Sequence, residues 1–201
     1  MQKKSTIRLS QYSNEDNMAN HVDNYVEIIC DSSIKLSKYF PKDKETDEYV
    51  DIEQLPWMPV KPEEQSDYDW YCENVGAKWC YPEDEWDNSM TFISAWSPCI
   101  AMLEYLVCAI AKDDETVEIR HHYTDEFYNY FGVAKYTYED GAVFNHSEQD
   151  WDLVKDHFMN KYQCDITHDD FDWWEEQEFG NPLEIQDDFI ANWRDEEWEQ
   201  L

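Results

Sequence analysis

The chain has 201 residues, and its 47 acidic and 15 basic residues give a net charge of −32 near pH 7. Aromatic residues make up 16% of the chain, which argues against disorder because acidic disordered chains are poor in aromatics. The length suits one domain with an elaboration, or two small domains. The negative charge disfavours nucleic acid, anionic membranes and acidic substrates as ligands, and it favours cations and basic proteins.

The charge is concentrated in two parts of the chain. Residues 1–40 carry five acidic and five basic residues, whereas residues 41–90 carry fifteen acidic residues against four basic ones. Residues 148–201 carry eighteen acidic residues against three basic ones, a net charge of −15. We therefore expect a folded body that displays an acidic insertion and an acidic C-terminal extension.

These shifts in composition predict the domain organisation. We expect a loosely ordered N-terminus over residues 1–17 and an α+β domain over residues 18–146. An acidic, proline-containing insertion without regular structure is expected at about residues 42–66, anchored by the apolar run at residues 55–59. Residues 147–201 are expected to form an acidic, mainly helical extension.

Near the N-terminus the sequence predicts one strand and one short helix. The segment Asn24–Cys30 (NYVEIIC) is rich in β-favouring residues and predicts a strand. Asp31 or Ser32 can cap a short helix that continues through Phe40, since the proline that follows ends it.

The next predicted elements are a buried strand and a buried helix. Residues 89–96 predict the strand. Ser97 and Pro98 then form a helix start, because serine accepts hydrogen bonds from the first helical amides and proline lacks an N–H that would have no helical partner. The helix through Ala111 is apolar around most of its circumference, so we expect it to be buried.

Two further strands and a hairpin follow the buried helix. Residues 116–123 (TVEIRHHY) and 131–138 (FGVAKYTY) predict strands. Asp140 and Gly141 predict a tight hairpin turn that leads into a short strand at residues 142–144.

Two helices are predicted in the C-terminal extension. Ser147 and Asp150 resemble a capping box for a helix that continues through Tyr162. A final helix is expected over residues 182–199. The apolar positions that share one face are Trp151, Val154 and Phe158 in the first helix, and Ile185, Phe189 and Trp193 in the second.

Three segments together resemble the YubB ferredoxin-like family of phage and plasmid proteins. They are NHVDNYVEIIC, DWYCENVGAKW and FISAWSPCIAMLEYL, and with the following strand pair they extend over about residues 18–146. The chain departs from the family pattern at His21, Val75 and Cys99. The resemblance implies an α+β ferredoxin-like fold, in which an antiparallel sheet has its helices on one face, and an origin on a mobile element. It implies no reaction.

The sequence gives little support for a metal site or an enzyme. Cys72 and Cys80 are separated by seven residues, and none of the six cysteines forms a C-x-x-C pair. The neighbouring histidines His121 and His122 would point to opposite faces of a strand. The acidic run at residues 169–178 lacks the glycine of a calcium-binding EF-hand loop. We expect reduced thiols, no metal, no cofactor and no catalytic activity.

The final helix predicts a row of negative charges. At 100° per residue, its carboxylates at positions 184, 188, 195 and 199 fall within an arc of about 60°. Arg194 is the one basic residue of this helix. DNA-binding proteins recognise duplex DNA largely through its regular array of charge, so such a row could occupy a DNA-binding channel. The alternative interpretation is a solvated helix face.

The function predicted from the sequence is that of a phage or mobile-element anti-defence inhibitor and DNA mimic. Its acidic surface would block the DNA-binding site of a host CRISPR effector or restriction nuclease in the host cytoplasm. The alternative is an acidic adaptor or immunity-like protein that binds a basic protein at a site unrelated to DNA. The acidic residues expected at the partner surface are Glu83, Asp84, Glu85, Asp87, Asp169, Asp170, Asp172, Glu175, Glu176, Glu178, Glu184, Asp187, Asp188, Asp195, Glu196, Glu197 and Glu199.

Overall fold

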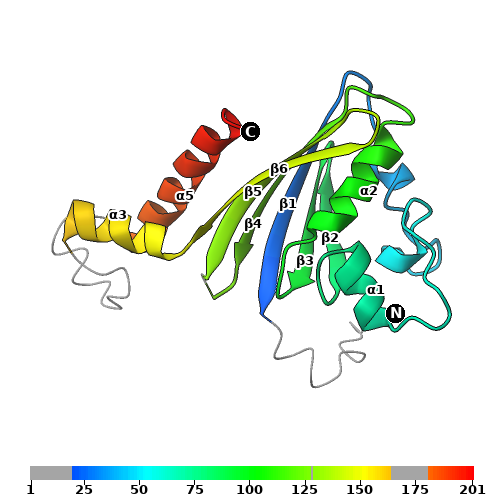
Figure 1. Cartoon of the computed structure of the whole chain (residues 1–201), viewed down its shortest axis with the longest axis horizontal. Helices are drawn as coiled ribbons and strands as arrows, with labels where there is room; N and C mark the ends of the chain where they lie inside the picture. The colour runs from blue at the N-terminus through cyan, green and yellow to red at the C-terminus, as the bar shows by residue number, and fades with distance from the viewer. Residues whose placement is uncertain (1–19, 128, 164–180) are drawn as a thin grey trace, which may run out of the picture.

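A six-stranded antiparallel sheet is the centre of the computed structural model, which describes residues 20–127, 129–163 and 181–201 (Figure 1). The strands lie in the order β2-β3-β1-β4-β5-β6. They are β1 His21–Ile29, β2 Cys80–Trp86, β3 Ser89–Ala95, β4 Glu118–Asp125, β5 Tyr130–Tyr138 and β6 Ala142–Asp150. The strands predicted from the sequence are confirmed, and the mixed α+β class is confirmed with them.

Four α-helices in the described part of the chain accompany the sheet. They are α1 Asp67–Asn74, α2 Ile100–Ile110, α3 Asp152–Tyr162 and α5 Pro182–Trp198, and short 3-10 turns form at Leu36–Lys38 and Ile52–Gln54. Figure 1 shows α1 and α2 on one side of the sheet and α3 and α5 on the other. Within the residues described, none of the helices combines the length and the hydrophobicity that a bilayer span requires.

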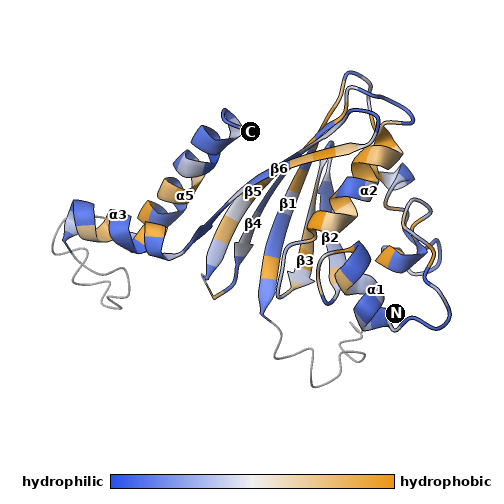
Figure 2. Cartoon of the chain, viewed as in Figure 1, coloured by the Kyte–Doolittle hydropathy of each residue, from blue (hydrophilic) through white to orange (hydrophobic). Residues whose placement is uncertain are grey.

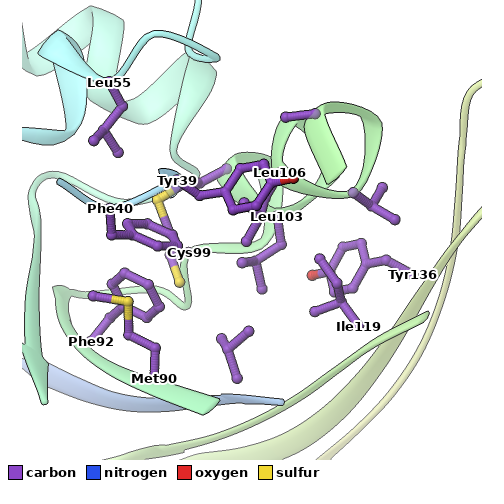
Figure 3. Packing of buried hydrophobic residues seen from close by; sticks show 14 of the residues in the cluster. Tyr39, Phe40, Leu55, Met90, Phe92, Cys99, Leu103, Leu106, Ile119 and Tyr136 are labelled. Atoms are coloured by element: carbon purple, nitrogen blue, oxygen red, sulfur yellow. The ribbon is translucent and has the colours of Figure 1, made fainter. Parts of the chain in front are cut away.

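The first hydrophobic core lies between the sheet and α2. Along β1, Val22, Val26 and Ile28 are buried, as expected for a strand whose alternate side chains face a core. Helix α2 buries most of its side chains here, and Figure 2 colours it largely hydrophobic. Figure 3 shows side chains from the insertion and the preceding loop closing this core from the side opposite the sheet. Those labelled in the figure are Tyr39, Phe40 and Leu55.

A second, smaller core fixes the C-terminal helices on the opposite face of the sheet. Phe131 and Val133 of β5 contact the apolar sides of α3 and α5. The rings of Phe131 and Trp193 meet edge to face, with centroids 4.9 Å apart. The predicted apolar face of α3 is confirmed, since Trp151, Val154 and Phe158 are all buried. The two described helices of the C-terminal extension are therefore packed on the sheet.

The predicted helix from Asp31 or Ser32 to Phe40 is wrong. Only the single 3-10 turn Leu36–Lys38 forms there. The backbone N–H of Ser32 donates instead to the carboxylate of Asp114, at 2.7 Å, which holds the start of this segment against the end of α2. A tertiary hydrogen bond thus replaces the predicted helix cap.

The predicted serine cap of α2 is also wrong. The helix begins at Ile100 with Cys99 as its N-cap, and the hydroxyl of Ser97 donates to the carbonyl of Gly76 at 2.7 Å. The N–H of Cys99 donates to the side-chain oxygen of Asn24 on β1, at 3.1 Å. The side chain of Asn24 therefore holds the residue before the helix, and the N-cap itself makes no side-chain hydrogen bond to the first turn.

The capping box predicted at Ser147 and Asp150 is wrong because β6 continues through both residues. Helix α3 begins at Asp152 and has Trp151 as its N-cap. The predicted turn at Asp140 and Gly141 is confirmed, and both residues have the positive φ angles that such a turn requires. The hairpin strand after it is nine residues long rather than three.

Candidate partner-binding surface

The predicted acidic row lies on the outer face of α5. The residues that this helix buries are Pro182, Gln186, Ile190 and Trp193. At 100° per residue, the four carboxylates of the row lie on the side of the helix opposite to those buried residues. All four are exposed, and none forms a salt bridge with another described residue. They are Glu184, Asp188, Asp195 and Glu199.

The one basic residue of α5 does not neutralise this row. Arg194 lies on the flank of the helix that faces the sheet, where its Nη2 donates to the Thr124 hydroxyl of β4 at 2.9 Å. Burial lowers the pKa of the Arg194 guanidinium, and the charge of Asp187 partly offsets that effect. Arg194 therefore attaches α5 to the sheet, and the outer carboxylates stay uncompensated.

Asp187 and Glu83 meet at a groove between α5 and the sheet. The groove has a volume of about 350 Å³ and also receives Asp23, Tyr25 and His122. It brings together two acidic segments that are about a hundred residues apart in the sequence, one on the edge strand β2 and one on α5. The sequence predicted both acidic residues, but nothing in their spacing predicted that they share a groove.

Partial burial raises the pKa values of two carboxylates of this groove, and neighbouring negative charges add to the effect. Partial burial raises the pKa of Asp23, and the charge of Glu126 adds to this effect. Partial burial also raises the pKa of Glu83, with further contributions from Asp23 and Asp84. The groove thus gathers the carboxylates of Asp23, Glu83 and Asp187 beside the guanidinium of Arg194.

His122 supplies a neutral, flat wall to the same groove. Its ring stacks on that of Tyr25, with centroids 4.7 Å apart and an interplanar angle of 24°. Burial lowers its pKa to about 3, and the charge of Arg194 acts in the same direction. The imidazole is therefore uncharged at neutral pH, and the basic side chain that lines the groove is Arg194.

The acidic segment of β2 does not form a single row. A β-bulge between Pro82 and Glu85 changes the direction of the strand, so that Glu83 borders the groove while Glu85 lies opposite the buried Met90. Burial raises the pKa of Tyr49 in the insertion, and the charge of Glu85 adds to this effect. Asp84 and Asp87 are both exposed, and Asp87 lies in the β2–β3 turn with a φ of 23°.

The remaining predicted acidic residues divide into two groups. Glu196 is exposed on α5 and Glu197 is partly buried there, outside the arc of the row. The acidic run of the tail falls outside the described residues. Its members are Asp169, Asp170, Asp172, Glu175, Glu176 and Glu178.

The sequence missed a buried polar network centred on Asn24 of β1. Its side-chain oxygen accepts from Cys99 N and from His121 Nε2, the latter at 3.0 Å, while its amide nitrogen donates to Ser94 Oγ at 2.9 Å. Burial lowers the pKa of His121 to about 3. All these groups lie inside the first core, out of reach of a substrate, so their role is to join β1, β3, β4 and α2.

Possible metal ligands do not converge over residues 20–127, 129–163 and 181–201, where no cluster of three suitable side chains forms. Cys72 is exposed whereas Cys80 is buried, so these two thiols lie in different environments. His121 faces the first core and His122 faces the groove, as their neighbouring positions on a strand predict.

Comparisons of the chain with protein-family models, with curated proteins and with solved structures returned no match.

Proposed function

We propose that the chain is a phage or mobile-element anti-defence inhibitor that acts as a DNA mimic. In this proposal its acidic surface occupies the DNA-binding site of a host CRISPR effector or restriction nuclease, stoichiometrically and without covalent chemistry. The site of action would be the host cytoplasm, where such nucleases work. The observation that carries the proposal is the exposed, unpaired acidic row on the outer face of α5.

The spacing of the row suits a surface that binds phosphates. With a rise of 1.5 Å per residue, its carboxylates are separated along the helix axis by about 6, 10 and 6 Å. Phosphates follow one another along a DNA strand at about 3.4 Å of axial rise, so the row corresponds to every second or third phosphate. The second core holds α5 against the sheet and thereby fixes the row in place.

The acidic row lowers the stability of the fold through repulsion between like charges. Like charges at adjacent turns of a helix destabilise it. A charge of −32 also opposes compaction and contributes nothing to the fold. The only basic residue of α5 is Arg194. It forms a hydrogen bond with the sheet and does not pair with the carboxylates of the row. The uncompensated row is best explained by a basic partner.

We also infer that residues 18–146 have a ferredoxin-like arrangement and an origin on a mobile element, like the YubB family. The order β1-α1-β2-β3-α2-β4 supports this inference, because it is the βαββαβ order of that fold. The strand order β2-β3-β1-β4, with antiparallel neighbours throughout, supports it further. The β5–β6 hairpin and the C-terminal helices would then be additions to this unit.

An acidic adaptor that binds a basic protein away from its DNA site is the second candidate. Two half-exposed tryptophans favour it: Trp86 and Trp96 expose 53% and 52% of their surface, near opposite ends of β3. Exposed tryptophans are frequent anchors of protein interfaces, and they imitate no part of a DNA backbone. In this case the groove beside α5 would receive a basic side chain of the partner.

An inhibition assay tests the proposal. The purified chain is titrated into CRISPR effectors and restriction nucleases, and cleavage of duplex DNA is followed. We expect stoichiometric loss of cleavage for the target, with weaker inhibition as the salt concentration rises. A nuclease that binds the chain tightly and still takes up and cleaves DNA would refute mimicry and favour the adaptor.

A further inference from the structure

The two edges of the sheet differ in how they are protected against strand pairing. Natural proteins protect exposed edge strands with proline, bulges, charges or short length, since an unpaired strand edge accepts another strand. The β2 edge has three of these features: Pro82, a bulge after it, and three consecutive acidic residues. The β6 edge has none of them over most of its length.

Strand β6 is long, regular and locally uncharged. Its nine residues pair with β5 in one continuous register, from Ala142 opposite Tyr138 to Asp150 opposite Tyr130, without a bulge. Residues 142–147 (AVFNHS) contain no acidic residue, lysine, arginine or proline. On the described part of the chain, no strand other than β5 pairs with β6, and Asn145 and His146 are exposed.

We propose that the outer edge of β6 pairs antiparallel with β6 of a second copy of this chain. The two-fold axis of such a pair passes near Asn145, so each strand meets the same residues of its partner and the interface is self-complementary. The two sheets then form one continuous sheet, and the backbone groups of both outer edges become paired.

The charge distribution favours a second copy over a basic partner at this edge. Two chains that each carry −32 repel each other over most of their surfaces. The neutral stretch at residues 142–147 is a place where they can approach without apposing carboxylates. A basic partner is attracted to acidic residues, which this stretch does not offer.

The side chains of β6 support a regular pairing. The ring of Phe144 stacks on Tyr136 of β5 and on His146, with centroid distances of 5.1 and 5.0 Å. These stacked rings pack β6 against β5 over the neutral stretch. A regular, uncharged edge is what a template for strand addition requires.

The test is the molar mass of the full chain in solution, measured by light scattering and sedimentation over a range of concentrations. We expect a dimer that tightens as salt is added, because salt screens the repulsion between the two chains. The salt dependence of this dimer is therefore opposite to that expected for a complex with a basic nuclease. The two proposals can thus fail independently.

Substitutions at Asn145 give the decisive variants. Asn145→Glu and Asn145→Lys each place two like charges opposite each other near the two-fold axis, so both should weaken the dimer by up to about fivefold. Val60→Glu and Val60→Lys are the matched controls, since Val60 is 91% exposed and lies far along the chain in the insertion. They should leave the dimer intact.

The lysine variant separates pairing at β6 from a general effect of charge. If only the net charge limited association, Asn145→Lys would strengthen the dimer, and that result would overturn the proposal. Near-ultraviolet circular dichroism verifies that each variant is folded. Hydrogen exchange should show protected outer amides in β6 of the wild type that become exchangeable in the Asn145 variants. A wild-type chain that is monomeric throughout also overturns the proposal.

Discussion

Neutralising the outer row of α5 should make the protein more stable and less able to bind its partner. The variant changes four exposed carboxylates to their neutral amides: Glu184→Gln, Asp188→Asn, Asp195→Asn and Glu199→Gln. These side chains have no basic partner among the described residues and lie opposite the buried face of α5. Their replacement therefore removes repulsion and breaks no salt bridge.

The size of the gain in stability follows from the spacing of the row. It contains two pairs of like charges four residues apart, Glu184 with Asp188 and Asp195 with Glu199, and each such pair destabilises a helix by about 0.2–0.5 kcal/mol. The free energy of unfolding should rise by about 0.4–1 kcal/mol. The negative charge of Glu184 interacts favourably with the helix dipole at the N-terminus, and that of Glu199 interacts unfavourably with it at the C-terminus. These two effects offset each other.

Urea unfolding measures the stability, and nuclease inhibition measures the function. The matched control carries the same change in net charge at exposed sites away from the proposed surface: Glu45→Gln, Glu63→Gln, Glu64→Gln and Glu115→Gln. We expect the row variant to lose most of its inhibition while the control retains it. Equal inhibition by the two variants, or a row variant that is less stable than the wild type, would contradict the reasoning.

Two further predictions concern the fold itself. Gly132→Ala should lower the free energy of unfolding by about 1–3 kcal/mol, because the added methyl group would overlap the buried ring of Tyr123, whose hydroxyl donates to Glu148 at 2.9 Å. Urea denaturation measures this loss, and a loss below about 0.5 kcal/mol would show that the ring can move aside. Acidification should destabilise the protein before its carboxylates titrate. The pKa of His121 is about 3 in the fold against about 6.5 in the unfolded chain, so its contribution is present above about pH 6.5 and is lost as the pH falls toward 3. In His121→Gln, unfolding followed from about pH 7 to about pH 5 should depend less on pH, and some dependence should remain because His122 is shifted in the same way. An unchanged slope in that variant would mean that His121 is already charged in the folded protein.

The elements that were predicted correctly are specified by short sequence patterns within each element. The strands at β1, β3, β4 and β5 alternate or cluster β-favouring residues, and the turn at Asp140 and Gly141 depends on two adjacent residues. The helix α1 was missed although its signal is also local. Ser66 accepts from the N–H of Asp69 at 3.1 Å, and the two side chains are hydrogen-bonded as well, which is a capping box that the sequence contains.

The wrong predictions share a physical cause, which is that a tertiary contact took the place of a local one. Ser97 is a good helix cap by residue type, but its hydroxyl donates to the carbonyl of Gly76, and the N–H of the N-cap residue Cys99 donates to Asn24. Ser147 was assigned to a helix cap although pairing with β5 keeps it in β6. A local pattern cannot show which distant group competes for the same hydrogen bond.

For the candidate site, the sequence predicted the residues better than their arrangement. The α5 row follows from helical periodicity alone, and its position opposite the buried face follows from the same periodicity. The groove that joins Glu83 to Asp187 depends on the placement of α5 against the sheet, which no single segment encodes. The bulge that separates Glu83 from Glu85 likewise depends on pairing with β3.

The most direct test of the DNA-mimic proposal is a competition measurement on a nuclease that the chain inhibits. Labelled, uncleavable duplex DNA is bound to the nuclease, and the chain is added while the fraction of bound DNA is recorded at constant salt. The proposal predicts that the chain displaces DNA completely, with an apparent affinity that falls in proportion to the DNA concentration. A ternary complex, in which the nuclease holds the chain and the DNA together, would contradict it.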